Sequence, residues 1–227
     1  DLNKKTMTKK IKMLIRRAAS VFCLGGMLLS AGLFTSCTEK DNTVEEFTNW
    51  QSKNETYWNK LYTTTQQKIK SGDTSWKIIL NYTFQNQKQT SGSALTYSPE
   101  DYIIAHVEQA GAGTASPLYS DSVSMHYMGR LIPSTTYTSG LIFDKSWSSD
   151  TFNAATSRPN HSYIGLSYDS QGKPISLVDG FTTALMSMHR GDHWTVYIPH
   201  QLGYGASASG AVPAYSTLIF DLRLVDF

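Results

Sequence analysis

Cysteine is almost absent from this sequence of 227 residues. The only two, Cys23 and Cys37, lie within the first 37 positions, so the chain beyond them needs no disulfide and no oxidising compartment to fold. No Walker, dinucleotide-binding or G-x-S-x-G motif occurs, which disfavours nucleotide-dependent and serine-hydrolase chemistry. His189 and His193 are four residues apart, but Gly191 between them interrupts the helical face that a metal-binding pair requires. We therefore expect neither a metal site nor a cofactor.

The sequence also lacks a strong excess of charge of either sign. It has 20 Lys and Arg and 18 Asp and Glu residues, a formal net charge of +2. Seven of the basic residues and one acid belong to residues 1–36, which leaves 13 basic and 17 acidic residues, a net charge of −4, from Cys37 onward. A mildly acidic body disfavours a polyanionic partner, so we expect no nucleic-acid binding.

The first 36 residues have the pattern of a secretory signal. Basic residues cluster at positions 9–17, after a candidate initiator at Met7, and an apolar run follows at 18–34. The ending Thr35-Ser36-Cys37 resembles a bacterial lipobox, in which the cysteine is acylated and becomes the first residue of the mature protein. An uncleaved membrane anchor is the alternative, although 17 apolar residues are few for a span.

We therefore expect a signal peptide at 1–36, a lipidated Cys37 and a polar tether at 37–46. The mixture of Lys and acidic residues after the cysteine resembles the surface-export tags of some Bacteroidetes lipoproteins. Acyl chains on Cys37 would hold the protein on a membrane, which predicts a place in the cell envelope at the outer membrane, on its periplasmic or its surface side.

The remaining chain combines one long helix with several strands. Aromatic and aliphatic residues recur at helical spacing over 45–69, and this stripe either packs on its own domain or forms a partner-binding face. Residues 76–84 and 101–107 are typical of strands, and 122–127, 194–198 and 217–225 alternate between apolar and polar side chains, as half-buried antiparallel strands do. A short helix of about three turns is predicted at 181–188, closed by Gly191. Strands around one helix describe an α+β domain.

Seven motifs in the second half of the chain then occur in a recognisable order. They are VSMHYMGRL at 123–131, FDKS at 143–146, LVDGF at 177–181, MHRGD at 188–192, IPHQLGYGA at 198–206, VP at 212–213 and TLIFD at 217–221. Together they resemble the FKBP-type peptidyl-prolyl cis-trans isomerases over about residues 100–227. The resemblance implies an antiparallel sheet of five to six strands curled around the short helix. We expect an FKBP-type domain at 99–227, preceded by a helix and strand extension at 47–98.

The same resemblance implies a proline-binding pocket between the sheet and the helix. Its expected lining is Tyr127, Phe143, Asp144, Leu177, Val178, Phe181, Tyr204, Val212 and Phe220. Proline-containing polypeptides would be the substrates, and macrolides possible inhibitors. In the implied roles, Phe181 forms the floor of the pocket and the other two phenylalanines its walls. The catalytic residues would be Asp144, which faces the twisting carbonyl carbon, Tyr127, which orients it, and Tyr204, which donates to a substrate carbonyl. The backbone N–H of Val178 would hold a second carbonyl.

Some features depart from the family pattern. Phe181 stands where the family usually has Trp, the loop at 206–211 is short, and Phe152, His161 and Tyr163 all compete for the position of a further pocket aromatic. Phe143 and Phe220 could be plain core residues, and Asp144 a turn residue. The predicted function is therefore isomerisation of X-Pro bonds in exported proteins, and the alternative is a catalytically weak module or chaperone that binds proline-containing segments.

Overall fold

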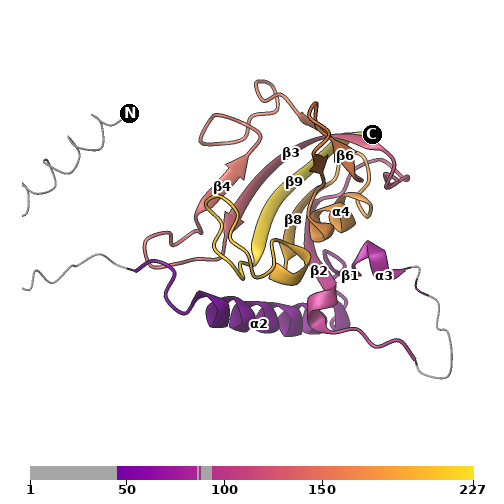
Figure 1. Cartoon of the computed structure of the whole chain (residues 1–227). Coiled ribbons are helices and arrows are strands. Elements are labelled where there is room, and N and C mark those ends of the chain that lie inside the picture. Colours follow the sequence, from indigo (N-terminus) through magenta and orange to yellow (C-terminus); the bar gives the residue numbers. More distant parts are fainter. Residues whose placement is uncertain (1–44, 86, 88–93) are drawn as a thin grey trace, which may run out of the picture. The chain divides into compact units, whose positions relative to one another are not determined.

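The computed structural model describes residues 45–85, 87 and 94–227 (Figure 1). The predicted signal peptide at 1–36, Cys37 and nearly all of the tether at 37–46 lie outside the described residues. Among the helices that are described, none is both long enough and apolar enough to span a bilayer.

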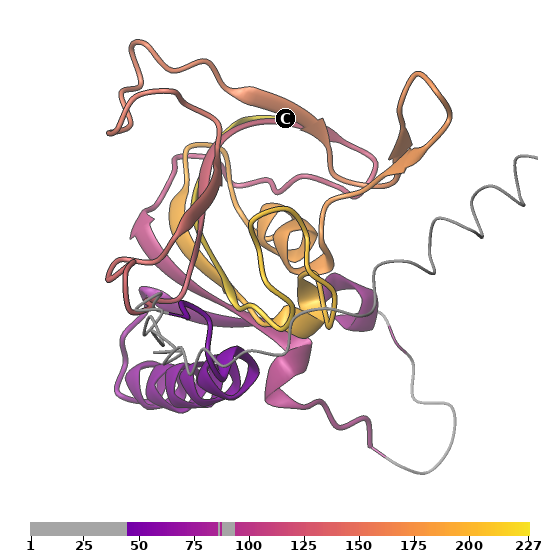
Figure 2. The ribbon, with the colours of Figure 1, turned by 60° about the vertical axis from the view of Figure 1, so that its left-hand side comes forward.

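One antiparallel sheet of seven strands organises the fold (Figures 1 and 2). Its strands are β1 Trp76–Leu80, β2 Tyr102–Gln109, β3 Ser122–Leu131, β4 Ile142–Lys145, β5 Asn160–Tyr163, β8 His193–Ile198 and β9 Leu218–Asp226. They lie in the order β1-β2-β8-β9-β3-β4, and β5 pairs with β3. The α+β class is confirmed: six strands come from the predicted domain, and β1 of the extension adds a seventh at the edge.

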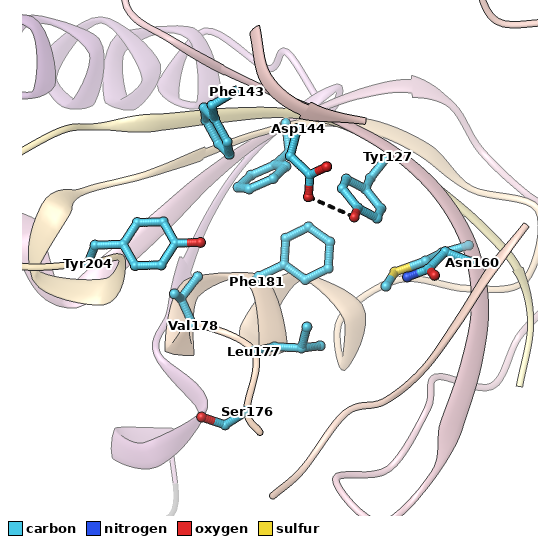
Figure 3. A pocket seen from close by; sticks show the side chains of 11 residues that line it. Tyr127, Phe143, Asp144, Asn160, Ser176, Leu177, Val178, Phe181 and Tyr204 are labelled. Carbon is cyan, nitrogen blue, oxygen red and sulfur yellow. Dashed lines mark hydrogen bonds between the residues drawn. The ribbon is translucent and has the colours of Figure 1, made fainter. Parts of the chain in front are cut away.

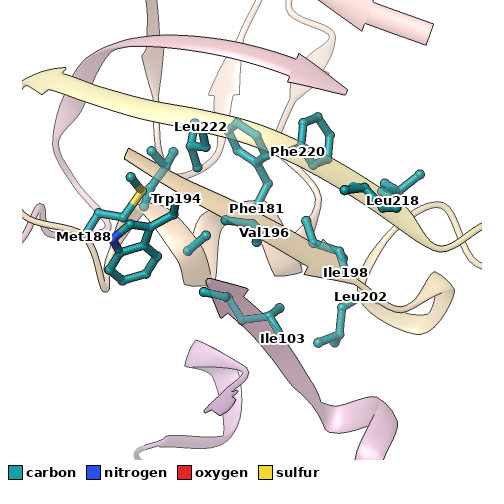
Figure 4. Packing of buried hydrophobic residues seen from close by; sticks show 14 of the residues in the cluster. Ile103, Phe181, Met188, Trp194, Val196, Ile198, Leu202, Leu218, Phe220 and Leu222 are labelled. Atoms are coloured by element: carbon teal, nitrogen blue, oxygen red, sulfur yellow. The ribbon is translucent and has the colours of Figure 1, made fainter. Parts of the chain in front are cut away.

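The short helix α4, Asp179–Leu185, lies against the concave face of this sheet. It has about two turns rather than the predicted three, because the helix ends at Leu185. The chain continues from there in turns and loop to Gly191, which adopts a positive φ of 89°. A Cβ on Gly180 would lie 2.3 Å from Cγ2 of Ile198, so this glycine allows α4 to approach β8 directly. Alternating residues of β8 and β9, among them Trp194 and Leu222, fill the space below α4 (Figure 4).

The prediction of a strand at 76–84 is wrong for the second half of this segment. Strand β1 ends at Leu80, and residues Tyr82–Gln85 form the short helix α3. Asn81 causes the change of direction, because its buried side chain donates to Thr83 (2.9 Å) and accepts from the Thr183 hydroxyl (2.8 Å). Such side-chain bonds compete with the ladder of a strand.

Several small elements were not predicted at all. They are the 3₁₀ turns η1 Pro99–Asp101 and η2 His200–Leu202, and a separate two-stranded hairpin of β6 Ser167–Tyr168 and β7 Pro174–Ile175. The hairpin lies between β5 and α4 in the sequence, in a segment whose short strands carry no clear alternation.

The long helix α2, Trp50–Lys70, packs on its own domain. Trp50 and Trp58 are buried, and their indole N–H groups donate to the Ser216 hydroxyl (2.7 Å) and the Pro99 carbonyl (3.3 Å). The aromatic stripe is therefore used for intramolecular packing, and it is not a free partner-binding face. The extension and the sheet belong to one compact unit, Val44–Phe227. The domain boundary expected at residue 99, between the extension and the FKBP-type domain, stays a prediction.

Asn54 should be the most sensitive polar position of α2. Its buried amide accepts a hydrogen bond of 2.7 Å from the Thr217 N–H and donates one of 2.7 Å to the Trp50 carbonyl. We expect Asn54→Ala to lower the free energy of unfolding by about 1–3 kcal/mol, because it leaves a buried N–H without an acceptor. Chemical denaturation would measure this loss.

Asn59→Ala is the matched control, since Asn59 is on the same helix and exposed. Its unfolding free energy should stay within about 0.5 kcal/mol of the wild type. Equal losses in the two variants would contradict the inferred anchoring of α2.

Candidate functional site

A cavity of about 160 Å³ opens between α4 and the concave face of the sheet (Figure 3). Strands β3, β4 and β9 supply one side, the loop into α4 and its first turn supply the floor, and the segment after η2 supplies Tyr204. The lining residues are Met125, Tyr127, Phe143, Asp144, Asn160, Ser176, Leu177, Val178, Phe181, Tyr204 and Phe220. Most of this surface is apolar or aromatic, with few polar tips, as in sites for small ligands.

The aromatic rings of the pocket meet edge to face. Phe181 and Phe220 have ring centroids 4.8 Å apart at 73°, and Phe143 meets Phe220 at 5.6 Å and 90°. Tyr127 approaches Phe181 edge-on at 6.0 Å. Edge-to-face contacts place the positive rim of one ring on the negative face of another, which fixes the orientation of the rings in the pocket wall.

A glycine of β3 makes room for this cluster. A Cβ added to Gly129 would lie 2.5 Å from Cζ of Phe143 and 2.7 Å from Cε1 of Phe220. Any side chain at this position would push both rings away from the strand. The glycine of the VSMHYMGRL motif therefore has a steric role in shaping the pocket wall.

A hydroxyl–carboxylate pair lies at the rim. The Tyr127 hydroxyl donates to Oδ2 of Asp144 over 2.8 Å, and Asp144 itself is exposed (Figure 3). Burial, and then the hydrogen bond and charge of Asp144, raise the pKa of Tyr127 to about 12. The phenol therefore stays protonated at physiological pH and holds one carboxylate oxygen, which fixes the direction of the other.

Tyr204 faces Asp144 across the opening. Its hydroxyl points toward the pocket, and 40% of the residue is exposed (Figure 3). Burial, followed by the nearby Asp144 charge, raises its pKa. It is thus a protonated hydroxyl available to a ligand carbonyl.

The start of α4 offers a second donor. The carbonyl of Val178 accepts hydrogen bonds from the N–H groups of Phe181 (2.9 Å) and Thr182 (3.1 Å), as expected at an N-cap. Its own N–H donates to no acceptor within residues 45–85, 87 and 94–227. The geometry thus leaves this amide free for a ligand.

Eight of the nine residues predicted to line the pocket do so, and Val212 does not. It is buried in the core and pairs through its backbone with Ser209, in a short turn before β9. Val212 therefore contributes to the core cluster and not to the cavity wall.

Sequence reasoning missed Met125, Asn160 and Ser176. Met125 could have been found, because it alternates with Tyr127 on the same face of β3. No aromatic candidate from the 145–163 segment lines the pocket: Phe152 instead packs on Trp147, with ring centroids 5.2 Å apart, and from this segment only Asn160, at the start of β5, lines the cavity. Neither the composition nor the spacing of the sequence could have predicted Asn160 as a residue of the cavity.

Fold and cavity together define a small α+β binding domain whose pocket suits one apolar ring flanked by carbonyl groups. No group of three or more His, Cys, Asp or Glu side chains in the described ranges is arranged to hold a metal ion.

Residues 113–225 match the family model described as FKBP-type peptidyl-prolyl cis-trans isomerase. The chain is 30% identical over 143 residues to a macrophage infectivity potentiator of Trypanosoma cruzi, which is 63% of this chain and 60% of that protein. It is 30% identical over 130 residues to the FKBP-type 22 kDa peptidyl-prolyl cis-trans isomerase of Escherichia coli strain K12, at coverages of 57% and 52%. Against the isomerase Mip of Coxiella burnetii, identity is 31% over 125 residues, at coverages of 52% and 42%.

Residues 113–225 therefore belong to the FKBP-type peptidyl-prolyl cis-trans isomerase family. The chain spans about half the length of the relatives it matches. The matched segment contains every residue that lines the cavity.

Ionisation of Tyr127 should be linked to folding. Its pKa of about 12 is above the value of about 10 of an unfolded tyrosine, so its stabilising contribution is complete below pH 10 and lost as the pH rises toward 12. We expect the stability difference between wild type and Tyr127→Phe to shrink by about 1 kcal/mol across this window, a partial value because Tyr127 is only partly buried. Denaturation at a series of pH values would measure it.

Tyr163→Phe is the control, because Tyr163 is an exposed tyrosine of β5 outside the pocket. Identical pH dependences for the two variants would refute the linkage.

Proposed function

We propose that this protein is a peptidyl-prolyl cis-trans isomerase that accelerates X-Pro bond rotation in exported polypeptides. The observation that carries the proposal is the Tyr127–Asp144 pair, 2.8 Å apart, at the rim of a cavity of edge-to-face aromatic rings. This arrangement combines an apolar place for a proline ring with an oriented carboxylate and separate hydrogen-bond donors for carbonyl groups.

The chemistry requires only that the pocket favour the twisted amide. Amide resonance sets a rotation barrier of about 18–20 kcal/mol, and uncatalysed exchange at proline takes tens to hundreds of seconds. In the twisted state the nitrogen no longer conjugates with the carbonyl, so the amide is less polar than in either planar form. An apolar pocket therefore stabilises the twisted state relative to both ground states, which lowers the barrier.

Each polar residue has a distinct proposed task. The phenylalanine floor holds the ring, Tyr204 and the Val178 N–H each bind a carbonyl beside the rotating bond, and Asp144, held by Tyr127, faces the carbonyl carbon. Bonds to the flanking carbonyls fix the two ends of the peptide, so rotation is confined to the one amide in the pocket.

A second candidate is a module that binds proline-containing segments with little turnover. The observations that favour it are Phe181, a smaller floor than the usual indole, and a cavity lining to which none of Phe152, His161 and Tyr163 contributes. Both reduce the apolar area around a bound ring. The two functions differ only in whether the bound amide rotates faster than in water.

Isomerisation of a proline tetrapeptide separates these candidates. We expect wild type to accelerate exchange and Asp144→Ala to lower kcat/KM by about 10-fold or more, since it removes an oriented charge. Tyr204→Phe should lower it by about fivefold, the loss of one hydrogen bond. Exposed matched controls are Asp150→Ala and Tyr163→Phe, which should keep wild-type rates. If wild type binds the peptide but its cis-trans exchange is no faster than in buffer alone, isomerase activity is refuted and the binding module is the function that is left.

We also propose that Cys37 carries lipid and holds the protein at the outer membrane in the cell envelope. The support comes from the sequence: a basic region, an apolar run and the Thr35-Ser36-Cys37 ending. The acidic body after the cysteine suits a domain held off the membrane by a polar tether.

Metabolic labelling with a radioactive or clickable palmitate tests the anchor. The wild-type chain expressed in a bacterial host should incorporate label and fractionate with membranes, whereas Cys37→Ser should lose the label. Cys23→Ser is the control, because that cysteine lies inside the predicted signal. Label that persists in Cys37→Ser would refute the proposal.

A further inference from the structure

The segment between β5 and α4 forms a hairpin whose two ends are both at the pocket. The chain leaves the cavity at Asn160, forms β6 and β7, and returns to the cavity at Ser176, Leu177 and Val178. The hairpin extends away from the sheet (Figure 2). Its position therefore places it beside any ligand chain that continues out of the pocket on this side.

The hairpin is unusually rich in exposed apolar side chains. Leu166, Tyr168 and Ile175, hereafter the hairpin surface, have exposed fractions of 53%, 64% and 51%. Among the large apolar residues of the described ranges, only Leu118 and Tyr163 are also more than half exposed. Tyr163 belongs to the same 160–178 segment, so four of the five most exposed apolar residues lie within it. These side chains are concentrated in one segment of the chain, on both faces of the hairpin, and exposed apolar residues concentrated in this way mark an interaction site more often than scattered single residues do.

Neither face of the hairpin packs on the body of the protein. Tyr168 lies opposite Pro174, and Ser167 lies opposite Ile175, so Tyr168 and Ile175 project from opposite faces. Both are more than half exposed. Burial therefore does not explain the hairpin, and an isolated two-stranded ribbon is only marginally stable in water.

The turn instead stabilises itself. The carboxylate of Asp169 accepts hydrogen bonds from the N–H groups of Gln171 and Lys173, both at 2.9 Å. The Asp169 N–H donates to the Lys173 carbonyl (3.0 Å), and Gly172 adopts a positive φ of 77°. Because these hydrogen bonds already fix the turn, the hairpin loses little further conformational entropy when a ligand binds to its exposed apolar side chains.

We propose that the hairpin surface binds the part of an unfolded polypeptide that flanks the proline held in the pocket. This inference rests on the proposed function, since it places the second contact of the same substrate. The segment 163–178 has one Asp and one Lys, so it offers no net charge and selects for apolar side chains. Unfolded chains expose such side chains and folded proteins bury them. The substrate class is therefore unfolded polypeptide with apolar residues near the proline.

The test compares two double variants that each replace one tyrosine and one isoleucine of the surface by serine. Tyr168→Ser with Ile175→Ser changes the hairpin surface. Tyr137→Ser with Ile69→Ser is the control, which removes the same residue types from the β3–β4 loop and the end of α2, where 41% and 40% of the residues are exposed. All four positions are at the surface, so both proteins should fold, and thermal unfolding would verify it. The probe is reduced, carboxymethylated α-lactalbumin carrying a fluorophore.

Two quantities are measured for each protein: the Kd for the unfolded probe by fluorescence anisotropy, and kcat/KM on a proline tetrapeptide. We expect the hairpin variant to weaken probe binding by about 10-fold relative to the control, the effect of losing two partly buried apolar contacts. Equal affinities in the two variants would overturn the inference. A self-association that the hairpin variant abolishes, seen by sedimentation with probe affinity unchanged, would overturn it in favour of a contact between copies.

The outcome for the proposed function is read separately. Tetrapeptide exchange at the buffer rate in wild type, together with hairpin-dependent probe binding, would refute isomerisation and support the hairpin surface. Normal tetrapeptide turnover together with hairpin-independent probe binding would refute the hairpin surface alone. The two failures therefore have different signatures.

Discussion

The contact between Phe181 and Phe220 joins the core of this domain to its pocket. One face of the cluster is core, where α4 meets β8 and β9, and the other face is the cavity wall. The rings therefore cannot reorient for a ligand without disturbing the packing beneath them. Two glycines make this double use possible: Gly180 brings the helix onto β8, and Gly129 leaves room for the rings on β3.

The N-terminal extension braces the same pocket from outside. Trp50 and Asn54 of α2 bond to Ser216 and Thr217, which immediately precede the strand that carries Phe220. Glu46 bonds to the Ser134 hydroxyl and the Thr136 N–H in the loop that leads to β4, the strand of Phe143 and Asp144. The side-chain bonds to Ser134 and Thr136 lower the pKa of Glu46 to about 2, so this carboxylate stays ionised at physiological pH. The extension, together with Glu46 at the end of the predicted tether, thus fixes two chain segments that enter pocket strands.

The sequence predicted the parts of the fold in which a local pattern and the tertiary environment agree. The alternation in β8 and β9 reflects one buried face, so those strands and the α+β class followed from it. The pattern failed at Asn81, where a side-chain bond to Thr183, 102 positions away, ends β1 early. The site shows the same division. Phe143, Phe181 and Tyr204 came from ordered motifs, whereas the burial of Val212 in the core and the position of Asn160 at the cavity depend on tertiary packing that no local residue pattern encodes.

In the proposed isomerase, the rigid apolar floor and the polar, exposed rim of the pocket have different tasks: the floor surrounds the rotating amide, and the rim binds the carbonyl groups on either side of it. Bond rotation needs a low-polarity environment at the amide itself, but the carbonyl groups on either side keep their full polarity and lose water when they enter. Tyr204, the Val178 N–H and the Tyr127–Asp144 pair lie around the opening, where they can replace that water without adding polarity to the floor. Because the floor is also core, it selects only for a ring of suitable size. In the proposed isomerase, discrimination between polypeptides would then come from contacts outside the cavity, and the 160–178 segment, which begins and ends at residues of the cavity, is the part of the fold that we propose for them.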